Sequence, residues 1–302
     1  MTDDNIEQLM EQGKYDEVLS LVQGDDQNSR LVRAFVLIKA GRLNEALKEL
    51  EGLEVPEASY LRFEIYRGLG DKEKAAREAM RLLEGREDDH LANYFVAQYF
   101  YDGGNLEEAL RHIDRALAVV PHSYEYKKLK AKILFDLGDY EGASVVLTDL
   151  LAMNPKDVEA RKMKAMCYYN LGLRMDALAE INKALDVRKD DVELRVLKAK
   201  IYYETGFYKL ALSDFKAALR LRPNDPDIAY SVAACYYHIE MYREAEEYVD
   251  MALRLSEKGE YYALKALIKK AEGDAESAKE LAKRAVHLEP STKPKVLDLL
   301  TE

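Results

Sequence analysis

The chain has 302 residues, of which 48% are apolar and 33% charged, with only 15 Gly and 7 Pro. This composition excludes collagen-like, low-complexity and intrinsically disordered chains, because Gly and Pro are scarce and apolar side chains can fill a core. A formal charge of -11 argues against bulk attraction to nucleic acid or anionic lipid, although a local basic face is compatible with an acidic body. No apolar run approaches the roughly 20 residues that cross a bilayer, and the acidic N-terminus lacks the apolar stretch of a secretory signal. We therefore expect a soluble, cytoplasmic protein without a membrane segment.

The first part of the chain, residues 1–89, carries a loose repeat. Glycine ends a helix readily where the backbone must turn left-handed, so regularly spaced glycines mark helix boundaries. Their spacing here predicts degenerate helix pairs with shorter helices, broken at 52–56 and 85–89. The turn glycines lie 28 and 29 residues apart and are Gly13, Gly41 and Gly70.

From residue 90 to residue 290 the repeat becomes strict. Six turn points follow one another at spacings of 34 residues, the last at 33, and an alanine stands seven residues before and five residues after each. This regularity predicts six regular helix-turn-helix units over 90–290. The turn points are Gly104, Gly138, Gly172, Gly206, Glu240 and Gly273. The alanines are Ala97, Ala109, Ala131, Ala143, Ala165, Ala177, Ala199, Ala211, Ala233, Ala245, Ala266 and Ala278.

Each unit is expected to be an antiparallel helix pair. In one of them Gly138 ends the first helix, a second helix runs over 140–152, and Pro155 stops it. The alanines mark places where two helix axes approach so closely that no larger side chain fits, and they should be almost fully buried. One pair alone leaves an apolar face uncovered, so successive pairs must stack to bury it.

The chain resembles the tetratricopeptide repeat family in its 34-residue period, paired alanines, turn glycine and closing proline, as in the run from Gly206 to Pro223. The resemblance covers 90–290. It implies an all-α solenoid of nineteen helices without strands, in which antiparallel pairs stack into a right-handed superhelix. We expect one continuous solenoid, closed by a C-terminal capping helix at 291–302. A departure is the absence of Trp, whose usual place is held by Asn93, Lys127, Arg161, Arg195, Ala229 and Tyr262.

Signatures of catalysis are missing from the sequence. It contains no Gly-x-x-x-x-Gly-Lys-Ser/Thr loop, no Gly-x-Gly-x-x-Gly fingerprint and no Gly-x-Ser-x-Gly elbow. Glu108 and His112, one helical turn apart, are interpreted as a surface pair rather than as metal ligands. Cys167 and Cys235 stand two units apart, on the order of 20 Å, which is too far for a disulfide, so they are expected to be small buried residues. The sequence predicts no enzyme activity and no cofactor or metal.

In the resembled family the first helices of successive units line a concave groove that receives a partner, which implies the same surface here. Three residues before each of the first five turn points stands an aromatic residue, and we call these five residues the aromatic ladder: Tyr101, Phe135, Tyr169, Tyr203 and Tyr237. The family pattern assigns the ladder to the groove and the residues just before it to packing, so Tyr168 and Tyr202 should be buried while the ladder is partly exposed. The alternative is that both sets pack between helices. The set assigned to packing is Phe100, Leu134, Tyr168, Tyr202 and Tyr236.

The predicted groove also carries polar and flexible side chains on the same helix faces. Its lysines are either partner contacts or a solvated face. The clamp with which some family members bind acidic chaperone tails is not in register, because Met163, Glu193 and Leu197 stand where it needs amide and basic side chains. The predicted groove residues besides the ladder are Tyr94, Gln98, Lys128, Lys132, Lys162, Met166, Lys200 and Tyr230.

These observations favour a non-enzymatic scaffold that binds a peptide, a helix or another protein in the groove. A second hypothesis is an association with RNA or another nucleic acid, although acids punctuate the same helices. A third is a structural subunit that assembles with copies of itself as a homo-oligomer. The nucleic-acid hypothesis rests on Lys127, Lys128, Lys130, Lys132, Arg161, Lys162 and Lys164, with tyrosines stacking on bases.

Overall fold

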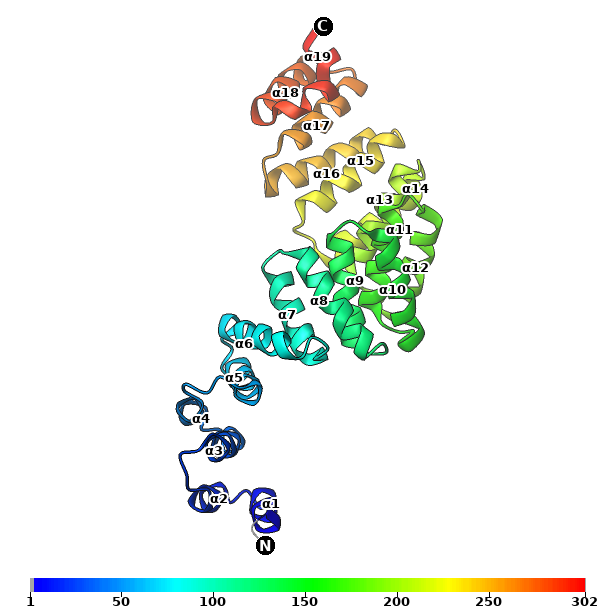
Figure 1. The fold of residues 1–302 in the computed structure, drawn as a ribbon. Helices are drawn as coiled ribbons and strands as arrows, with labels where there is room; N and C mark the ends of the chain where they lie inside the picture. Colours follow the sequence, from blue (N-terminus) through cyan, green and yellow to red (C-terminus); the bar gives the residue numbers. More distant parts are fainter. Residues whose placement is uncertain (1–2, 302) are drawn as a thin grey trace. The chain divides into compact units, whose positions relative to one another are not determined.

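A computed structural model describes residues 3–301, and this part of the chain forms nineteen α-helices and one 3-10 helix without any strand (Figure 1). The all-α prediction is therefore confirmed, and residues 1, 2 and 302 lie outside the described part. The helices divide into two compact units, 1–153 and 154–302, each of which is described by itself. That the pairs form one continuous array stays a prediction.

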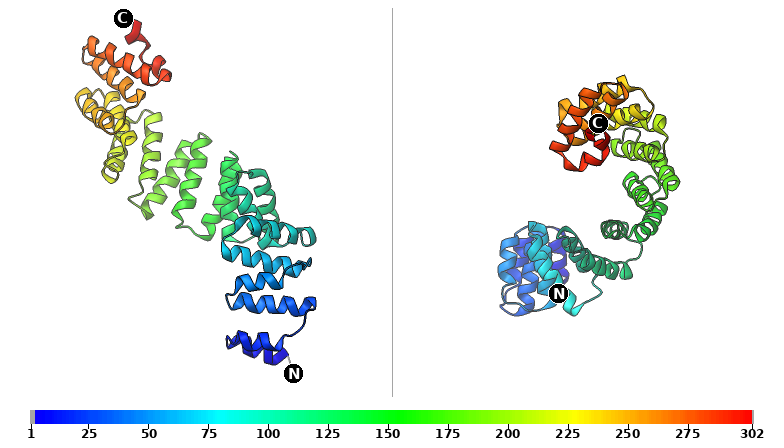
Figure 2. Two further views of the ribbon diagram at one scale, coloured as in Figure 1. Left: turned by 90° about the vertical axis from the view of Figure 1, so that its left-hand side faces the viewer. Right: turned by 90° about the horizontal axis from the view of Figure 1, so that it is seen from above.

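Unit 1 contains five helix pairs in which each odd-numbered helix packs on the next even-numbered one. Figure 2 shows the antiparallel course of consecutive helices from two directions. Only α1, α2 and α4 are short, with 9, 7 and 7 residues, whereas α5 and α6 have 14 each, so the expectation of shorter helices over 1–89 is only partly correct. The helices are α1 (Asp3–Glu11), α2 (Tyr15–Leu21), α3 (Gln27–Lys39), α4 (Leu43–Glu49), α5 (Pro56–Leu69), α6 (Lys72–Gly85), α7 (His90–Asp102), α8 (Leu106–Val119), α9 (Tyr124–Asp136) and α10 (Tyr140–Met153).

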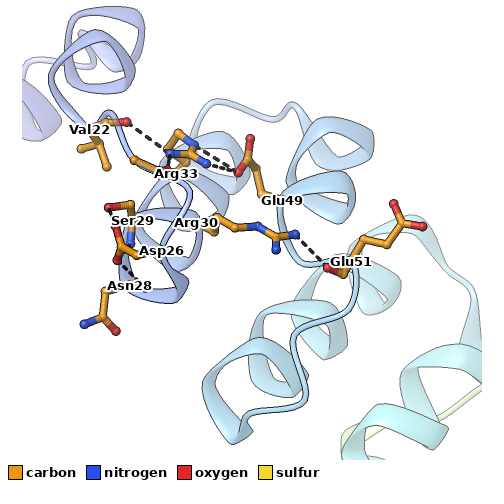
Figure 3. A network of polar contacts seen from close by, with 9 residues as sticks. Val22, Asp26, Asn28, Ser29, Arg30, Arg33, Glu49 and Glu51 are labelled. Atoms are coloured by element: carbon orange, nitrogen blue, oxygen red, sulfur yellow. Dashed lines mark hydrogen bonds and ion pairs between the residues drawn. The ribbon is translucent and has the colours of Figure 1, made fainter.

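Two arginines on α3 fasten the loops at the start of unit 1 (Figure 3). The Arg33 guanidinium donates to Glu49 Oε2 at 2.7 and 3.0 Å and also reaches the Val22 carbonyl at 3.4 Å. Arg30 Nη2 donates to the Glu51 carbonyl at 2.7 Å. Hydrogen bonds from a charged donor are stronger than those between neutral groups. These arginines therefore stabilise the loops that lie beside two of the shortest helices.

Unit 2 contains four helix pairs and a C-terminal segment. The capping helix expected over 291–302 is shorter than predicted, because Pro294 lies within a 3-10 helix and α-helix begins only at Leu297. Val296 and Leu299 are nevertheless buried against the last pair. The elements are α11 (Val158–Asn170), α12 (Arg174–Val187), α13 (Val192–Glu204), α14 (Tyr208–Leu221), α15 (Pro226–His238), α16 (Tyr242–Leu255), α17 (Gly259–Ala271), α18 (Ala275–Leu288), η1 (Pro290–Val296) and α19 (Leu297–Thr301).

The repeat residues behave as their spacing predicts. All twelve alanines are at most 1% exposed, so the prediction that they are almost fully buried is confirmed. The turn glycines of the regular units have φ between 77° and 87°, a left-handed conformation that Glu240 also adopts with φ 62°. Glu240 is the only non-glycine residue with positive φ among residues 3–301.

Strain at Glu240 leads to a prediction. Changing Glu240→Gly should raise the free energy of unfolding by about 1 kcal/mol, because relief of the left-handed strain exceeds the added chain entropy of glycine. The reverse change at the equivalent turn, Gly206→Glu, should lower it by a similar amount. Urea denaturation followed by circular dichroism measures both, and unchanged midpoints would contradict the strain at this turn.

Second helices differ in how they begin, and α2 and α4 follow the basic residues Lys14 and Arg42, which form no side-chain cap. In α8, α10 and α18 a polar residue caps the helix: Asn105, Asp139 and Asp274 accept a hydrogen bond from a backbone N–H in the first turn. A cap of this kind contributes about 1 kcal/mol. In unit 2 three successive second helices, α12, α14 and α16, begin without a side-chain cap, after the apolar residues Leu173, Phe207 and Met241.

At several of the places where the family carries Trp, a polar side chain pairs with the second helix. Asn93 is fully buried; its Oδ1 accepts a hydrogen bond from His112 Nδ1 at 2.9 Å, and its amide nitrogen donates to two carbonyl groups. His112, on the second helix α8, is thus half-buried and hydrogen-bonded to the first helix of the same pair, α7. It is not part of a surface pair with Glu108. In α11 the Arg161 guanidinium donates to Glu180 Oε2 at 2.7 Å. Each of these two polar contacts connects the two helices of one helix pair, and its two residues are 19 positions apart in the sequence.

Candidate functional site

The aromatic ladder lies near the C-terminal ends of the first helices, and all five residues are half-buried. Tyr169 and Tyr203 are therefore partly exposed, as expected. Three of the ladder tyrosines also form hydrogen bonds through their hydroxyl groups. In each case the partner is the residue that directly follows the next member of the ladder. Tyr101 donates to Asp136 Oδ2 at 2.7 Å, Tyr169 donates to Glu204, and the Tyr203 oxygen lies 2.9 Å from His238 Nε2. The ladder thus links neighbouring first helices and also presents ring surface to the outside.

The pKa values of the ladder phenols reflect these contacts. Burial and the hydrogen bond to Asp136 raise the pKa of Tyr101 to about 12. For Tyr169 the hydrogen bond to Glu204 is the main cause of a raised pKa, and for Tyr203 it is burial. These hydroxyl groups therefore stay protonated at neutral pH and act as hydrogen-bond donors.

The residues assigned to packing are not all buried, which corrects one expectation. Leu134 and Tyr236 are buried, but Tyr168 and Tyr202 are half-exposed. The cause lies twelve residues further along, on the second helix. Tyr248 stacks on Tyr236 with ring centroids 5.5 Å apart, whereas the equivalent place opposite Tyr202 holds Asp214. A carboxylate cannot cover a ring, and Tyr202 is instead covered by the Lys198 ammonium, 5.9 Å from the ring centroid.

In unit 1 the predicted groove residues of α7 and α9 come together in part. Tyr94 stacks on Tyr126 with centroids 4.5 Å apart, and Gln98 Nε2 donates to the Tyr94 hydroxyl at 2.8 Å. Lys128 and Lys132 are half-buried and form no ion pair with any described residue. The sequence did not indicate Tyr126, which packs in the core of unit 1 and hydrogen-bonds His90 Nδ1 at 2.8 Å.

In unit 2 the first helices α11, α13 and α15 line an open hollow of about 330 Å³. Lys162, Met166 and Lys200 lie in it, as the sequence predicts for groove residues. Tyr169 and Tyr203 do not line the hollow but follow Met166 and Lys200 by three residues, so they continue the same helix faces by one turn. The remaining lining residues are Val192, Glu193, Val196, Leu197, Arg222, Asp225, Asp227, Ile228 and Ser231.

The hollow has an apolar floor and a rim of charges that mostly neutralise one another. Glu193 forms an ion pair with Lys162 and lies 3.7 Å from the Arg222 guanidinium. Asp227 accepts hydrogen bonds from Lys258 and Tyr261, and these hold the pKa of its carboxyl below the ordinary value. Lys200 is exposed and makes no ion pair within residues 3–301. The floor consists of Met166, Val192, Val196, Leu197 and Ile228.

The basic residues proposed for nucleic acid are largely occupied within their own units. Lys127 pairs with Asp149 at 2.6 Å and Lys130 with Asp114 at 2.6 Å. Arg161 and Lys162 likewise pair with glutamates. Lys164 is buried and lies over the Tyr168 ring. The remaining two, Lys128 and Lys132, do not make an uninterrupted positive track.

The other reactive side chains have structural surroundings. Cys167 and Cys235 are buried and outside any disulfide, and burial raises the pKa of Cys235 to about 12, so its thiol stays protonated at neutral pH. Within residues 3–301 no group of three His, Cys, Asp or Glu side chains is arranged to hold a metal ion. None of the described helices combines the length and the apolar character needed to cross a membrane.

Comparisons with known proteins agree with this architecture. Tetratricopeptide repeat models match residues 60–124, 97–144, 134–201, 202–268 and 259–292, which together extend over most of the chain. A comparison with curated proteins found no match.

Solved structures with a similar fold include a tetratricopeptide repeat protein from Parabacteroides merdae, at 21% identity and a TM-score of 0.57 over 82% of this chain and 99% of that chain. PilF from Pseudomonas aeruginosa matches at 17% identity and a TM-score of 0.58, over 72% of this chain and 99% of that one. YrrB, described as a TPR protein with an unusual peptide-binding site, matches at 21% identity and a TM-score of 0.54, over 65% and 100%. At these identities the likeness concerns the fold alone.

Proposed function

The chain belongs to the tetratricopeptide repeat family, and we propose that it is a non-enzymatic scaffold that holds a peptide or helical segment of a protein partner on the first helices of unit 2. The observation that carries this proposal is the hollow between α11, α13 and α15, with its apolar floor and charged rim. Among the similar structures, YrrB is described as binding a peptide, which is consistent with this kind of surface.

The chemistry of the hollow selects the kind of segment that it would hold. An apolar side chain would leave water on entering the floor, and burial of about 100 Å² of apolar surface is worth roughly 2.5 kcal/mol. The rim charges are largely paired within the protein, so they add little net attraction and serve to orient the segment. Central apolar contacts surrounded by a polar rim are the arrangement in which binding energy is concentrated.

The ladder extends this surface beyond the hollow. Tyr169 and Tyr203 lie one turn from Met166 and Lys200, and their rings are fixed by hydrogen bonds at the hydroxyl end. A ring that is already held loses little conformational entropy on binding, so it adds contact area at low cost. The paired state of most basic residues, by contrast, leaves little positive charge for phosphate groups.

Filling the hollow should abolish binding without disturbing the fold. Ser231 is half-exposed on α15, and its hydroxyl only donates to the Asp227 carbonyl at 2.7 Å. The change Ser231→Phe should therefore place a ring in the hollow and weaken binding at least about tenfold, equal to about 1.4 kcal/mol. The probe is a set of peptides selected from a random library on the full-length chain, each titrated by fluorescence anisotropy.

The matched control is Ser213→Phe, the same substitution on the exposed face of α14, which should leave the affinity unchanged. In the same titration the double change Tyr169→Ala and Tyr203→Ala should also weaken binding about tenfold. It should lower the melting temperature as well, because both half-buried rings contact the neighbouring first helix. Tyr236→Ala, at a buried ring, should lower stability without weakening binding. Selected peptides that bind the Ser231→Phe variant as tightly as the wild type would contradict the proposal.

A further inference from the structure

Unit 2 exposes an apolar stripe at the starts of its second helices, away from the hollow. Leu173, Phe207 and Met241 stand at equivalent places in three successive helix pairs of unit 2, directly before α12, α14 and α16. Figure 1 labels these three helices. Their exposed fractions are 45%, 59% and 40%. Met175 and Leu210, in the first turns of α12 and α14, are 77% and 50% exposed. These five residues are the apolar stripe.

The stripe replaces polar groups that other second helices of the same chain use. Asn105, Asp139 and Asp274 occupy the equivalent places and cap their helices, whereas Leu173, Phe207 and Met241 leave the first N–H groups without a side-chain acceptor. A large apolar residue at such a place gives up capping. The Phe207 ring meets the Tyr202 ring edge-on with centroids 6.5 Å apart, but more than half of Phe207 stays in water, so folding alone does not account for three such residues in succession.

The size of the stripe fits one side of a protein interface. At about 200 Å² for a fully exposed large apolar residue, its five members expose on the order of 500 Å². A standard interface covers about 800 Å² per partner, of which somewhat more than half is apolar.

The charges at its two ends identify the occupant. At the Leu173 end, Asp176 is exposed and forms no ion pair with a described residue. At the Met241 end, Arg243 has 91% of its side chain exposed, and its ion pair with Glu247 is long, at 3.9 Å. Leu173, Phe207 and Met241 recur at the 34-residue period, with Phe207 in the middle. A two-fold axis through Phe207 would therefore place Leu173 of one copy on Met241 of another and bring Asp176 towards Arg243 at both ends.

We propose that the apolar stripe of unit 2 is a self-complementary surface on which two copies of this chain form a two-fold symmetric dimer. Phe207 lies at the axis, and two Asp176–Arg243 pairs set the register. None of the stripe residues lines the hollow, so Phe207→Asp leaves the hollow intact and Ser231→Phe leaves the stripe intact. The stripe borders the helix ends that carry the ladder, because the rings of Tyr202 and Phe207 meet with centroids 6.5 Å apart.

Sedimentation velocity of the full-length chain, from about 1 to 100 µM, tests the proposal. The wild type should associate to a dimer, and Phe207→Asp should raise the dimer dissociation constant at least tenfold, since a central aromatic anchor is replaced by a charge. The matched control is Val145→Asp, at an apolar residue of α10 that is 65% exposed and outside the stripe, which should leave association unchanged.

Charge reversal tests the register. Asp176→Arg and Arg243→Asp should each weaken the dimer, because like charges then meet across the axis, and the two changes combined should restore it. Phe207→Asp also supplies a cap, so its melting temperature at dilution should rise by about 2 °C, which distinguishes loss of the surface from misfolding.

Three results would overturn the proposal: a wild type that stays monomeric at 100 µM, a dimer that survives Phe207→Asp, or a combined charge reversal without rescue. The test also includes vesicles with phosphatidylserine. Flotation of a monomeric wild type with these vesicles, lost in Phe207→Asp, would assign the stripe to a lipid surface instead.

Discussion

The change Glu180→Ala is expected to lower the free energy of unfolding by about 3 kcal/mol or more. The Glu180 side chain, only 8% exposed on α12, accepts hydrogen bonds from Arg161 at 2.7 Å and from Lys183 at 2.8 Å. Removing it leaves the Arg161 guanidinium, whose side chain is 15% exposed, without its counter-charge. An unpaired buried charge is costly, whereas the ammonium of Lys183 is mostly exposed and returns to water.

The loss should depend on pH in a defined direction. Burial opposes ionisation of Glu180, but hydrogen bonds from Lys183 and Arg161 outweigh it and hold the pKa of the carboxyl below the ordinary 4.5. A group whose pKa is lower in the native state stabilises it fully above its ordinary pKa, and this contribution disappears as the pH falls through the lowered value. The difference in stability between wild type and Glu180→Gln should therefore shrink in acid.

Two controls separate the buried pair from ordinary surface charges. Glu247→Ala removes the acid of an exposed pair and should change the free energy of unfolding by less than about 0.5 kcal/mol. The double change Arg161→Met and Glu180→Leu should be less harmful than Glu180→Ala alone, because no buried charge then remains unpaired. Urea denaturation between about pH 3 and 7 measures the wild type and all four variants. Equal losses for Glu180→Ala and Glu247→Ala would contradict the expected role of burial.

The ion pair between Arg161 and Glu180 is a feature that was not predicted from the sequence. The 34-residue period, the alanines and the turn glycines predict the helix pairs correctly, because each signal is local and is repeated many times. The absence of Trp was noted, but its consequence was not recognised, although complementary polar residues stand 19 positions apart at Asn93 and His112 and at Arg161 and Glu180. Such spacing becomes meaningful only once the two helices of a unit are known to face each other.

The candidate site was predicted less completely than the fold. Lys162, Met166 and Lys200 lie in the hollow of unit 2, because a helical period is sufficient to place them on one face. The exposure of Tyr202 was not predictable from its own helix, since it depends on whether the facing second helix offers a ring, as Tyr248 does, or a carboxylate. The role of the ladder as a partner surface stays a prediction.

The exposed stripe illustrates a different limit. The sequence shows that Leu173 and Phe207 follow turn glycines, but an apolar residue there could equally pack inward as part of the core. Only the structure shows that these side chains remain exposed and that the helices after them lack a side-chain cap.

Gly259→Ala should lower the free energy of unfolding by about 2–3 kcal/mol, although Gly→Ala substitutions in helices ordinarily stabilise. Gly259 is the first residue of α17 and is buried against the end of α18. A methyl group on it would lie 2.3 Å from the Glu289 Cβ and 2.8 Å from the Ala285 carbonyl oxygen. Backbone and Cβ atoms cannot rotate away, so the start of α17 would have to move from α18.

The effect should be concentrated at the C-terminal end, because a repeat protein transmits packing energy mainly between neighbouring units. Hydrogen exchange of the amides in α17, α18 and α19 should accelerate in Gly259→Ala, while the amides of α11 and α12 should be little changed. The matched control is Gly85→Ala, at the last residue of α6, where an added methyl group meets no atom within 4 Å. That change should instead raise stability by about 0.5 kcal/mol. If Gly259→Ala gave the same small gain, the close approach of α17 to α18 would be wrong.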